Sequence, residues 1–333
     1  MGGTMSANDY KNALYESIMH LLWRQWVSIG VAGHAVPVRN DYSIDPECLI
    51  LISSKFCRYD QRLFDAVADW LLKYGQLVNP TRIKALQRGF HHCDLSSLAY
   101  LASLQTEAGD KRWIQLAKKG KSGNEGLQAM FLTPDGEAIS HCPVKDPLAL
   151  EYGFIRPRYI AKNKVNGRLP ENTATLLLRL RGLTGVSARS DIMHQLMISP
   201  RSIQQLVNYC GFARNPINDV IKELQLANIV TQVSSSGRNA VFVLSDADKL
   251  KIFFKCTDCR PIHWLSIYES LSCVWELVSN PALSRLSDAT FQGELHLLFR
   301  EELQSNLLNC GITELEQLTE ERIAELPQLL YHI

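Results

Sequence analysis

The chain has 333 residues, of which 46% are hydrophobic and 21% charged, and its formal net charge is +1. This length allows two or three domains, and the composition excludes a disordered or fibrous chain. No apolar run reaches the length of a membrane-spanning helix, and the small net charge excludes a general attraction of the whole chain to polyanions.

The N-terminus, MGGTMSANDY, lacks a basic segment followed by an apolar core, so we expect no secretory signal. The nine cysteines are scattered without the regular spacing of a disulfide framework, which indicates free thiols in a reducing compartment. We therefore expect a cytoplasmic protein with no membrane partner.

Charge is unevenly distributed along the chain. Residues 150–244 carry twelve Arg or Lys against five Asp or Glu, whereas residues 263–333 carry three against eleven. A basic middle thus precedes an acidic C-terminal part, and any anion-binding role is expected in the middle.

Residues 1–150 are predicted to form an N-terminal helical domain. Asp45 suits an N-cap and Pro46 the first position of a helix, and Gly75 suits a helix end. Apolar residues at helical spacing predict helices over about 10–29, 45–56, 61–74, 80–87 and 95–104.

Residues 151–172 are predicted to be an extended basic linker, because Pro and Gly are frequent here and FIRPRYIAKNKV (154–165) alternates apolar and basic residues. Clustered cations release counterions from a polyanion when they bind it. The linker therefore contributes four candidate phosphate contacts, namely Arg156, Arg158, Lys162 and Lys164.

Residues 173–250 have the most organised pattern in the chain. A Leu-rich helix over 173–183 is followed by a helix predicted to begin at Ser190. Ser202 and Gln205 fit a capping box for the next helix, which Gly211 ends.

The last helix of this module is predicted to begin with Asn215 as its cap and Pro216 as its first residue. Its buried stripe recurs at helical spacing, at Ile217, Val220, Ile221 and Leu224. Two antiparallel strands, residues 229–233 and 240–244, follow it and are joined by the polar tip SSSGRN.

The exposed face of that helix carries side chains suited to reading DNA. Asn and Gln can pair with adenine, whereas Arg and Lys can bind guanine or phosphate. The candidate DNA-binding residues of the module are Arg201, Arg214, Asn215, Asn218, Lys222 and Gln225, with Arg238 and Asn239 in the tip between the strands.

This arrangement of helices and hairpin resembles the winged helix-turn-helix superfamily of bacterial and archaeal transcriptional regulators. The resemblance covers about 173–244. A wider similarity, through RLRGLTGVSAR (179–189) and the helix after Asp60, is to winged-helix proteins of toxin–antitoxin or phage-defence operons. The resemblance implies that the last helix enters the major groove while the tip reaches phosphate or the minor groove.

Residues 251–333 are predicted to form an acidic C-terminal helical domain. Regulators commonly bind two half-sites as dimers, so we expect a homodimer. The Trp23/Trp26 helix and the C-terminal helices are candidates for its surface, or alternatively for a core folded back within one chain.

Sequence motifs of the common enzyme classes are absent: there is no P-loop, no GxGxxG after a strand and no GxSxG. Cys256 and Cys259 form a single CxxC followed by His263, whereas a structural zinc site normally needs four ligands. We therefore expect neither an enzyme, nor a metal, nor a cofactor, although a zinc site that recruits Cys273 or a distant His stays open.

The sequence thus predicts a mainly α protein with a central winged helix-turn-helix. Its expected function is that of a sequence-specific regulator that binds double-stranded DNA, a repressor, of a toxin–antitoxin or phage-defence operon. The alternative is a protein-interaction module, such as an antitoxin or a component of a defence complex, that grips a protein partner from the same operon.

Overall fold

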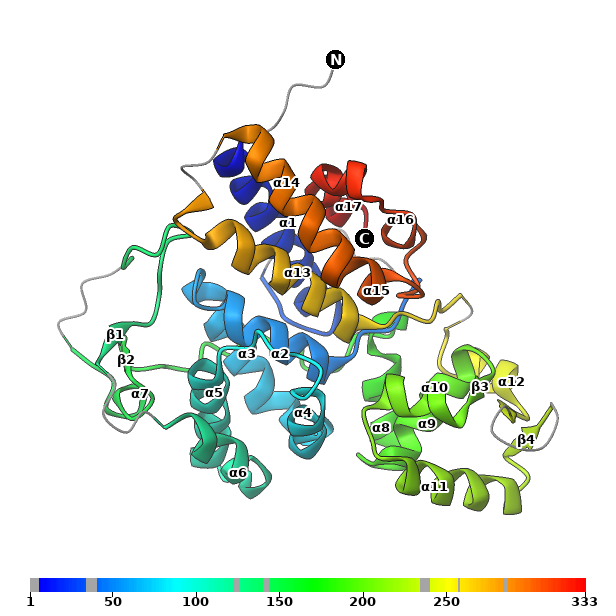
Figure 1. Ribbon diagram of the computed structural model, residues 1–333. Coiled ribbons are helices and arrows are strands. Elements are labelled where there is room, and N and C mark those ends of the chain that lie inside the picture. The colour runs from blue at the N-terminus through cyan, green and yellow to red at the C-terminus, as the bar shows by residue number, and fades with distance from the viewer. Residues whose placement is uncertain are drawn as a thin grey trace.

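The computed structural model describes residues 6–33, 41–121, 126–139, 144–233, 240–256, 258–283 and 287–333. Within these residues the protein is mainly helical, as the sequence predicts, with two small sheets. None of the helices in the described ranges is long and apolar enough to cross a membrane. A helical body contains the first and the last described residues, and a smaller module lies beside it (Figure 1).

The N-terminal helices begin where polar side chains cap them. Asp45 accepts hydrogen bonds from the backbone N–H groups of Glu47 and Cys48, and Pro46 is the first helical residue, as predicted. The α-helices of this part are α1 (Ala7–Ser28), α2 (Pro46–Phe56), α3 (Gln61–Tyr74), α4 (Pro80–Leu86), α5 (Leu95–Glu107), α6 (Ile114–Ala117) and α7 (Pro147–Leu150).

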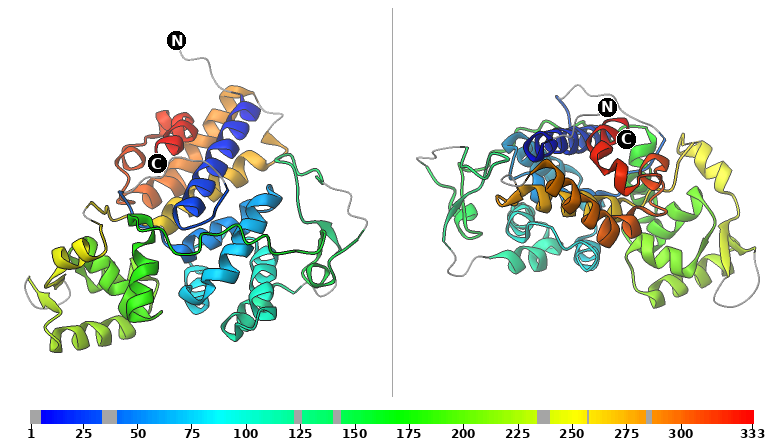
Figure 2. Two further views of the ribbon diagram at one scale, coloured as in Figure 1. Left: turned by 180° about the vertical axis from the view of Figure 1, so that it is seen from behind. Right: turned by 45° about the horizontal axis from the view of Figure 1, so that its top comes forward.

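The C-terminal helices pack on the N-terminal ones. They are α13 (Trp264–Ser279), α14 (Asp288–Leu298), α15 (Gln304–Leu307), α16 (Thr313–Glu316) and α17 (Leu326–His332). The hydroxyl of Tyr10 donates to the carbonyl of Ile323 at 3.1 Å, and α1 lies alongside α13 in both views (Figures 1 and 2).

The described residues of 1–150 and those of 262–333 therefore share one hydrophobic core, whereas Phe254 and Cys256 belong to the core of the module, so the predicted boundary at residue 250 lies inside the module. Trp26 of α1 and Trp275 of α13 are both buried in the shared core. The sequence left open whether the Trp-bearing helices form a dimer surface or a core within one chain, and in the structure these tryptophans lie in the core of one chain.

The segment 151–172, expected to be an extended linker, is fixed to the body. Its strand β2 (Phe154–Ile155) pairs in parallel with β1 (Gln128–Ala129). Further along, the backbone N–H of Asn166 donates to the carbonyl of Gly30 at 2.8 Å. The segment then runs across the body to the module (Figure 2).

The module has its own hydrophobic core. Its elements are α8 (Leu176–Thr184), α9 (Ala188–Ile198), β3 (Arg201–Ser202), α10 (Ile203–Cys210), α11 (Arg214–Leu226), β4 (Val230–Gln232), β5 (Val241–Leu244) and α12 (Ala247–Phe253). The predicted antiparallel hairpin is confirmed, since β4 pairs with β5. The sequence did not predict β3, which pairs with the other edge of β5 and gives the order β3-β5-β4.

Local signals explain where most helices of the module begin and end. Ser202 and Gln205 form the predicted capping box. Gly211 ends α10 at φ 70°, and a Cβ there would lie 2.6 Å from the Leu86 side chain. The left-handed backbone therefore favours glycine here, and any larger residue would also have to displace the Leu86 side chain. The start of α9 differs from the prediction, because Ser187 caps it and Ser190 is already inside the helix.

Candidate nucleic-acid interface

Helix α11 has one buried and one exposed side. Ile217, Ile221 and Leu224 are buried against α9, α10 and β4, because apolar residues at this spacing share one face of a helix. The helix lies at the outer edge of the module, away from α3 (Figure 1). Its other side is therefore open to a partner.

Four of the predicted contact residues share that open side. Arg214 and Lys222 are exposed, whereas Asn218 and Gln225 are partly buried. These residues are three or four positions apart, so their side chains form one row along the helix. The structure thus brings together a row of two cations and two amides.

The predicted role of Asn215 as the cap of α11 is wrong. The helix begins at Arg214, and Ala213, which has no capping side chain, occupies the N-cap position. Asn215 lies inside the first turn and is exposed. Arg214 is held near α10, where its Nη1 lies 3.3 Å from Oε1 of Gln204.

The face is not strongly basic. Asp219 and Glu223 are also exposed on α11, so the helix itself carries equal numbers of acidic and basic residues. Arg189 of α9 pairs with Glu223 at 2.5 Å. If this face binds DNA, contacts with base edges would have to supply much of the affinity for DNA, in addition to contacts with phosphates.

Arg201 does not lie on the surface as expected for a DNA contact. It is 6% exposed, and its guanidinium lies over the ring of Tyr209, 4.0 Å from the centroid. Its Nε and Nη2 have no hydrogen-bond partner among the described residues. Stacking on the aromatic ring, rather than contact with phosphate, accounts for its position.

Arg156 is likewise not a free cation of a linker. It is 1% exposed, and its Nη2 lies 3.0 Å from Oδ1 of Asp65 in α3. Aromatic rings surround the guanidinium, namely those of Phe64, Tyr100, Phe131 and Tyr159. This arginine stabilises the body and cannot reach a phosphate from there.

The other three candidate phosphate contacts of the segment are exposed but lie against α3, not beside α11. Arg158, Lys162 and Lys164 are exposed, and Nζ of Lys162 pairs with Asp65 at 2.8 Å. The carboxylate of Asp69 accepts the backbone N–H groups of both lysines. The structure therefore separates these cations from the row on α11.

Arg238 and Asn239 lie outside the described residues, so the predicted contacts of the tip stay a prediction.

A buried group of five charged residues joins the module to the body. It comprises Arg82, Arg181, Asp45, Glu47 and Asp191. Arg82 pairs with Asp45 at 2.5 Å and with Glu47 at 2.6 Å, and its Nε donates to the carbonyl of Cys210 at 2.6 Å. Arg181 pairs with Asp191 at 2.9 Å. The end of α10 is thereby fixed to α2 and α4.

Two guanidinium groups pair with three carboxylates in this group, and the pKa values of Asp45 and Asp191 shift in opposite directions. Burial raises the pKa of Asp191, although Arg181 opposes the shift. Burial also acts on Asp45, but there the charge and hydrogen bond of Arg82, the backbone N–H of Cys48 and the charge of Arg181 together outweigh it and hold the pKa of Asp45 below the usual range. The sequence carried one signal of this group, because Glu47 interrupts an otherwise apolar pattern, PECLILI.

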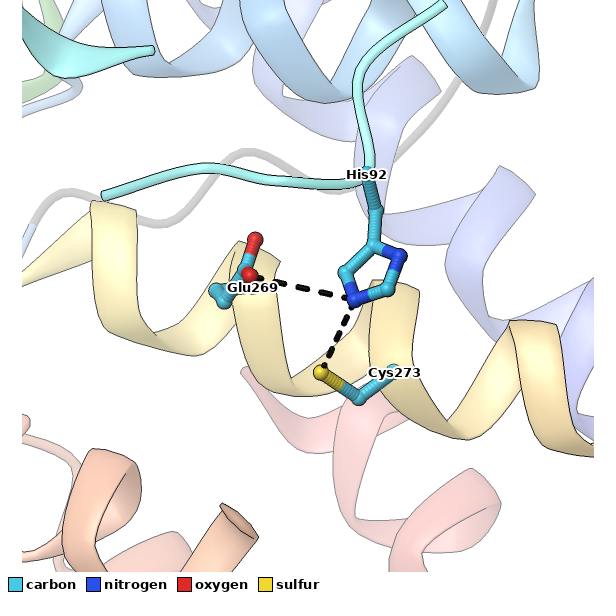
Figure 3. Close-up of side chains that lie close together, drawn as sticks. All are labelled: His92, Glu269 and Cys273. Carbon is cyan, nitrogen blue, oxygen red and sulfur yellow. Dashed lines mark hydrogen bonds and ion pairs between the residues drawn. The ribbon is translucent and has the colours of Figure 1, made fainter. Parts of the chain in front are cut away.

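One set of side chains could hold a metal ion. His92, from the connection between α4 and α5, faces Glu269 and Cys273 of α13 (Figure 3). Nε2 of His92 lies 3.3 Å from Sγ of Cys273 and 3.8 Å from Oε1 of Glu269. Burial, followed by the charge of Glu269, raises the pKa of the Cys273 thiol to about 12.

The CxxC pair belongs to a different part of the structure. A hydrogen bond from Cys259 lowers the pKa of Cys256 to about 7. Within the described ranges, neither cysteine belongs to a set of three neighbouring side chains able to hold a metal.

Comparison of the chain with protein-family models, with curated proteins and with solved structures finds no match in any of the three.

Proposed function

We propose that the protein is a sequence-specific regulator that binds double-stranded DNA through a winged helix-turn-helix formed by α9, α10, α11 and the β3-β5-β4 sheet. The order of three helices and an antiparallel sheet supports this assignment. In this arrangement α11 enters the major groove and α10 braces it across the backbone.

The observation that carries the proposal is the open side of α11. Arg214, Asn218, Lys222 and Gln225 form a row there, and their side chains can donate to or accept from base edges in the major groove. Because the row contains only two cations, the proposal is sequence-specific recognition and not general binding to polyanions.

We further propose that the regulator acts as a homodimer that represses its own operon, of the toxin–antitoxin or phage-defence kind. A dimer would present two copies of α11 to half-sites about one helical turn, or a multiple of it, apart. The proposed role is regulatory, without a catalytic step.

The test is a selection of bound duplexes from a random library by the purified protein, followed by binding titrations at increasing salt. The expected result is one enriched motif whose affinity falls with salt with a slope of about −2, because each of the two cations in the row releases counterions when it contacts a phosphate. A variant with Arg214, Asn218, Lys222 and Gln225 all changed to Ala should lose the motif.

The matched control changes Arg158, Lys162 and Lys164 to Ala, which removes three exposed cations on the α3 side. This control should keep the motif. If neither variant changes binding, or if no motif is enriched, the assignment of α11 as the reading helix is wrong.

A second candidate function is supported by apolar side chains on the module. Leu226 is 86% exposed, and Ile252 and Phe253 of α12 are 69% and 65% exposed. Exposed apolar groups of this size are common at protein-binding surfaces. The protein-interaction alternative predicts that Ile252→Ser with Phe253→Ser abolishes co-purification of a partner while DNA binding is unchanged.

A further inference from the structure

We propose that His92, Glu269 and Cys273 bind one Zn²⁺ ion that joins the connection between α4 and α5 to α13. This site is far from the row on α11 along the chain, and its existence does not depend on DNA binding. The proposal and the proposed regulatory function can therefore fail separately.

The two separations that His92 makes with the other donor atoms are close to those of tetrahedral zinc. Zn–N and Zn–O distances near 2.05 Å and a Zn–S distance near 2.3 Å place neighbouring ligand atoms about 3.3–3.6 Å apart. Nε2 of His92 is 3.3 Å from Sγ of Cys273 and 3.8 Å from Oε1 of Glu269. The third separation, between Sγ of Cys273 and the nearer oxygen of Glu269, is within 4.8 Å, so a side-chain adjustment of about an ångström or less would complete the three-ligand side of a tetrahedron.

The backbone places the donors before any ion arrives. Glu269 and Cys273 are four residues apart on α13, so both project from the same face of the helix. Both oxygens of Glu269 accept the backbone N–H of His91, at 3.2 and 3.1 Å. That contact holds the His92 loop against α13, with the imidazole directed at the other two ligands (Figure 3).

The surroundings also suit a metal. Glu269 and Cys273 are buried, whereas the His92 side chain is 29% exposed, which leaves a route for the ion and for water as a fourth ligand. On the other side of the imidazole, Oε1 of Glu276 lies 4.0 Å from Nδ1 of His92. That oxygen is paired with Nζ of Lys55 and is too far for a hydrogen bond to the ring, but a small rotation of the imidazole would bring it to the place where a carboxylate orients a ligating histidine.

Zinc binding would replace the proton of the Cys273 thiol, which passes to water, because the thiolate is the metal ligand. A neutral His, a thiolate and a carboxylate suit Zn²⁺ better than Mg²⁺ or Ca²⁺, which prefer oxygen ligands alone.

The first experiment measures zinc in the full-length protein. Protein treated with a chelator is incubated with Zn²⁺, passed through a desalting column and analysed for metal. The parent should retain one equivalent, whereas Cys273→Ser and His92→Ala should each lose stoichiometric binding. The matched control is Cys93→Ser, which removes a neighbouring, partly buried thiol outside the set and should retain the metal.

The second experiment uses Co²⁺, whose coordination by a thiolate gives a charge-transfer absorption band. The band should form in the parent and in Cys93→Ser and be absent in Cys273→Ser. Glu276→Gln should keep the band but weaken binding about tenfold.

Circular dichroism of each variant without metal separates lost binding from lost folding. The proposal is wrong if the folded parent binds less than one equivalent, if no thiolate band forms with Co²⁺, or if Cys93→Ser and Cys273→Ser lose metal equally. Those results would mean that Cys273 and His92 form only a partly buried hydrogen bond.

Discussion

Nη1 of Arg181 lies 2.6 Å from Oε1 of Glu47, Nη2 lies 3.0 Å from Oε2, and neither side chain is exposed to solvent. Such a two-pronged pair is strong and specific in geometry. Removing one partner from water-excluded surroundings leaves the other as an uncompensated charge.

Arg181→Met should therefore lower the free energy of unfolding by about 3–5 kcal/mol, because Glu47 and Asp191 both lose a cation. Chemical denaturation followed by circular dichroism measures this. Lys121→Ala is the control, because Lys121 pairs with Glu151 at a site where both side chains are about half exposed. The free energy of unfolding of this variant should not differ measurably from that of the parent. Equal effects of the two changes would contradict the proposed importance of the buried group.

Replacement of Asn218 tests base reading on α11. Asn218→Ala should cost about 1–3 kcal/mol of binding to the preferred duplex and relax the preference at one base pair. Lys222→Ala should instead weaken all duplexes alike and reduce the salt slope by about 1. Competition titrations with single-base variants of the selected motif distinguish the two. A uniform loss of affinity for Asn218→Ala would mean that this amide contacts no base.

Arg156→Met should lower the free energy of unfolding by about 3 kcal/mol, because Asp65 would lose its buried partner. The affinity of the folded variant for DNA should equal that of the parent, since Arg156 is enclosed by aromatic rings. Arg158→Met is the matched control and should leave stability unchanged, because Arg158 is exposed. If Arg156→Met lowers the salt slope of a fully folded protein, the residue does contact phosphate.

The pH dependence of stability should include a contribution from His194. Burial, together with the positive charges of Arg181 and Arg82, lowers its pKa to about 3, despite an opposing effect of Asp45. The unfolded histidine has a pKa of about 6.5. As the pH falls below that value, His194 is protonated in the unfolded state but stays neutral in the folded state. The free energy of unfolding therefore decreases between about pH 6.5 and pH 3.

At pH 5 this contribution amounts to about 2 kcal/mol. His194→Gln should remove it, and the difference appears when the free energy of unfolding is compared at pH 7.5 and pH 5. His332→Gln, at an exposed position, should retain the pH dependence of the parent. An unchanged slope in His194→Gln would show that other groups cause the acid sensitivity.

Features encoded by neighbouring residues could be predicted from the sequence. The Asp45-Pro46 helix start, the capping box of Ser202 and Gln205, and the end of α10 at Gly211 each depend on contacts within about one helical turn. The hairpin of β4 and β5 could be predicted because apolar and polar residues alternate within two short segments. Four helices of the N-terminal part begin within two residues of their predicted starts, at Pro46, Gln61, Pro80 and Leu95.

Contacts between distant residues could not be predicted. Arg156 and Asp65 are 91 residues apart, and nothing around either one distinguishes a buried arginine from a basic linker. Arg201 was expected at the surface because nothing in the sequence shows that Tyr209, at the far end of the following helix, places its ring under the guanidinium. The start of α11 was misplaced because the capping position holds Ala213, a residue without a signal of its own.

The buried charges between body and module have a consequence for how the molecule unfolds. Cut out as a fragment, residues 173–250 would carry Arg181 without Glu47, and the end of α10 would lose the guanidinium of Arg82. The body and the module therefore each supply charged residues whose partners lie in the other part. We expect heating to produce one cooperative transition in which both cores melt together, rather than two separate steps.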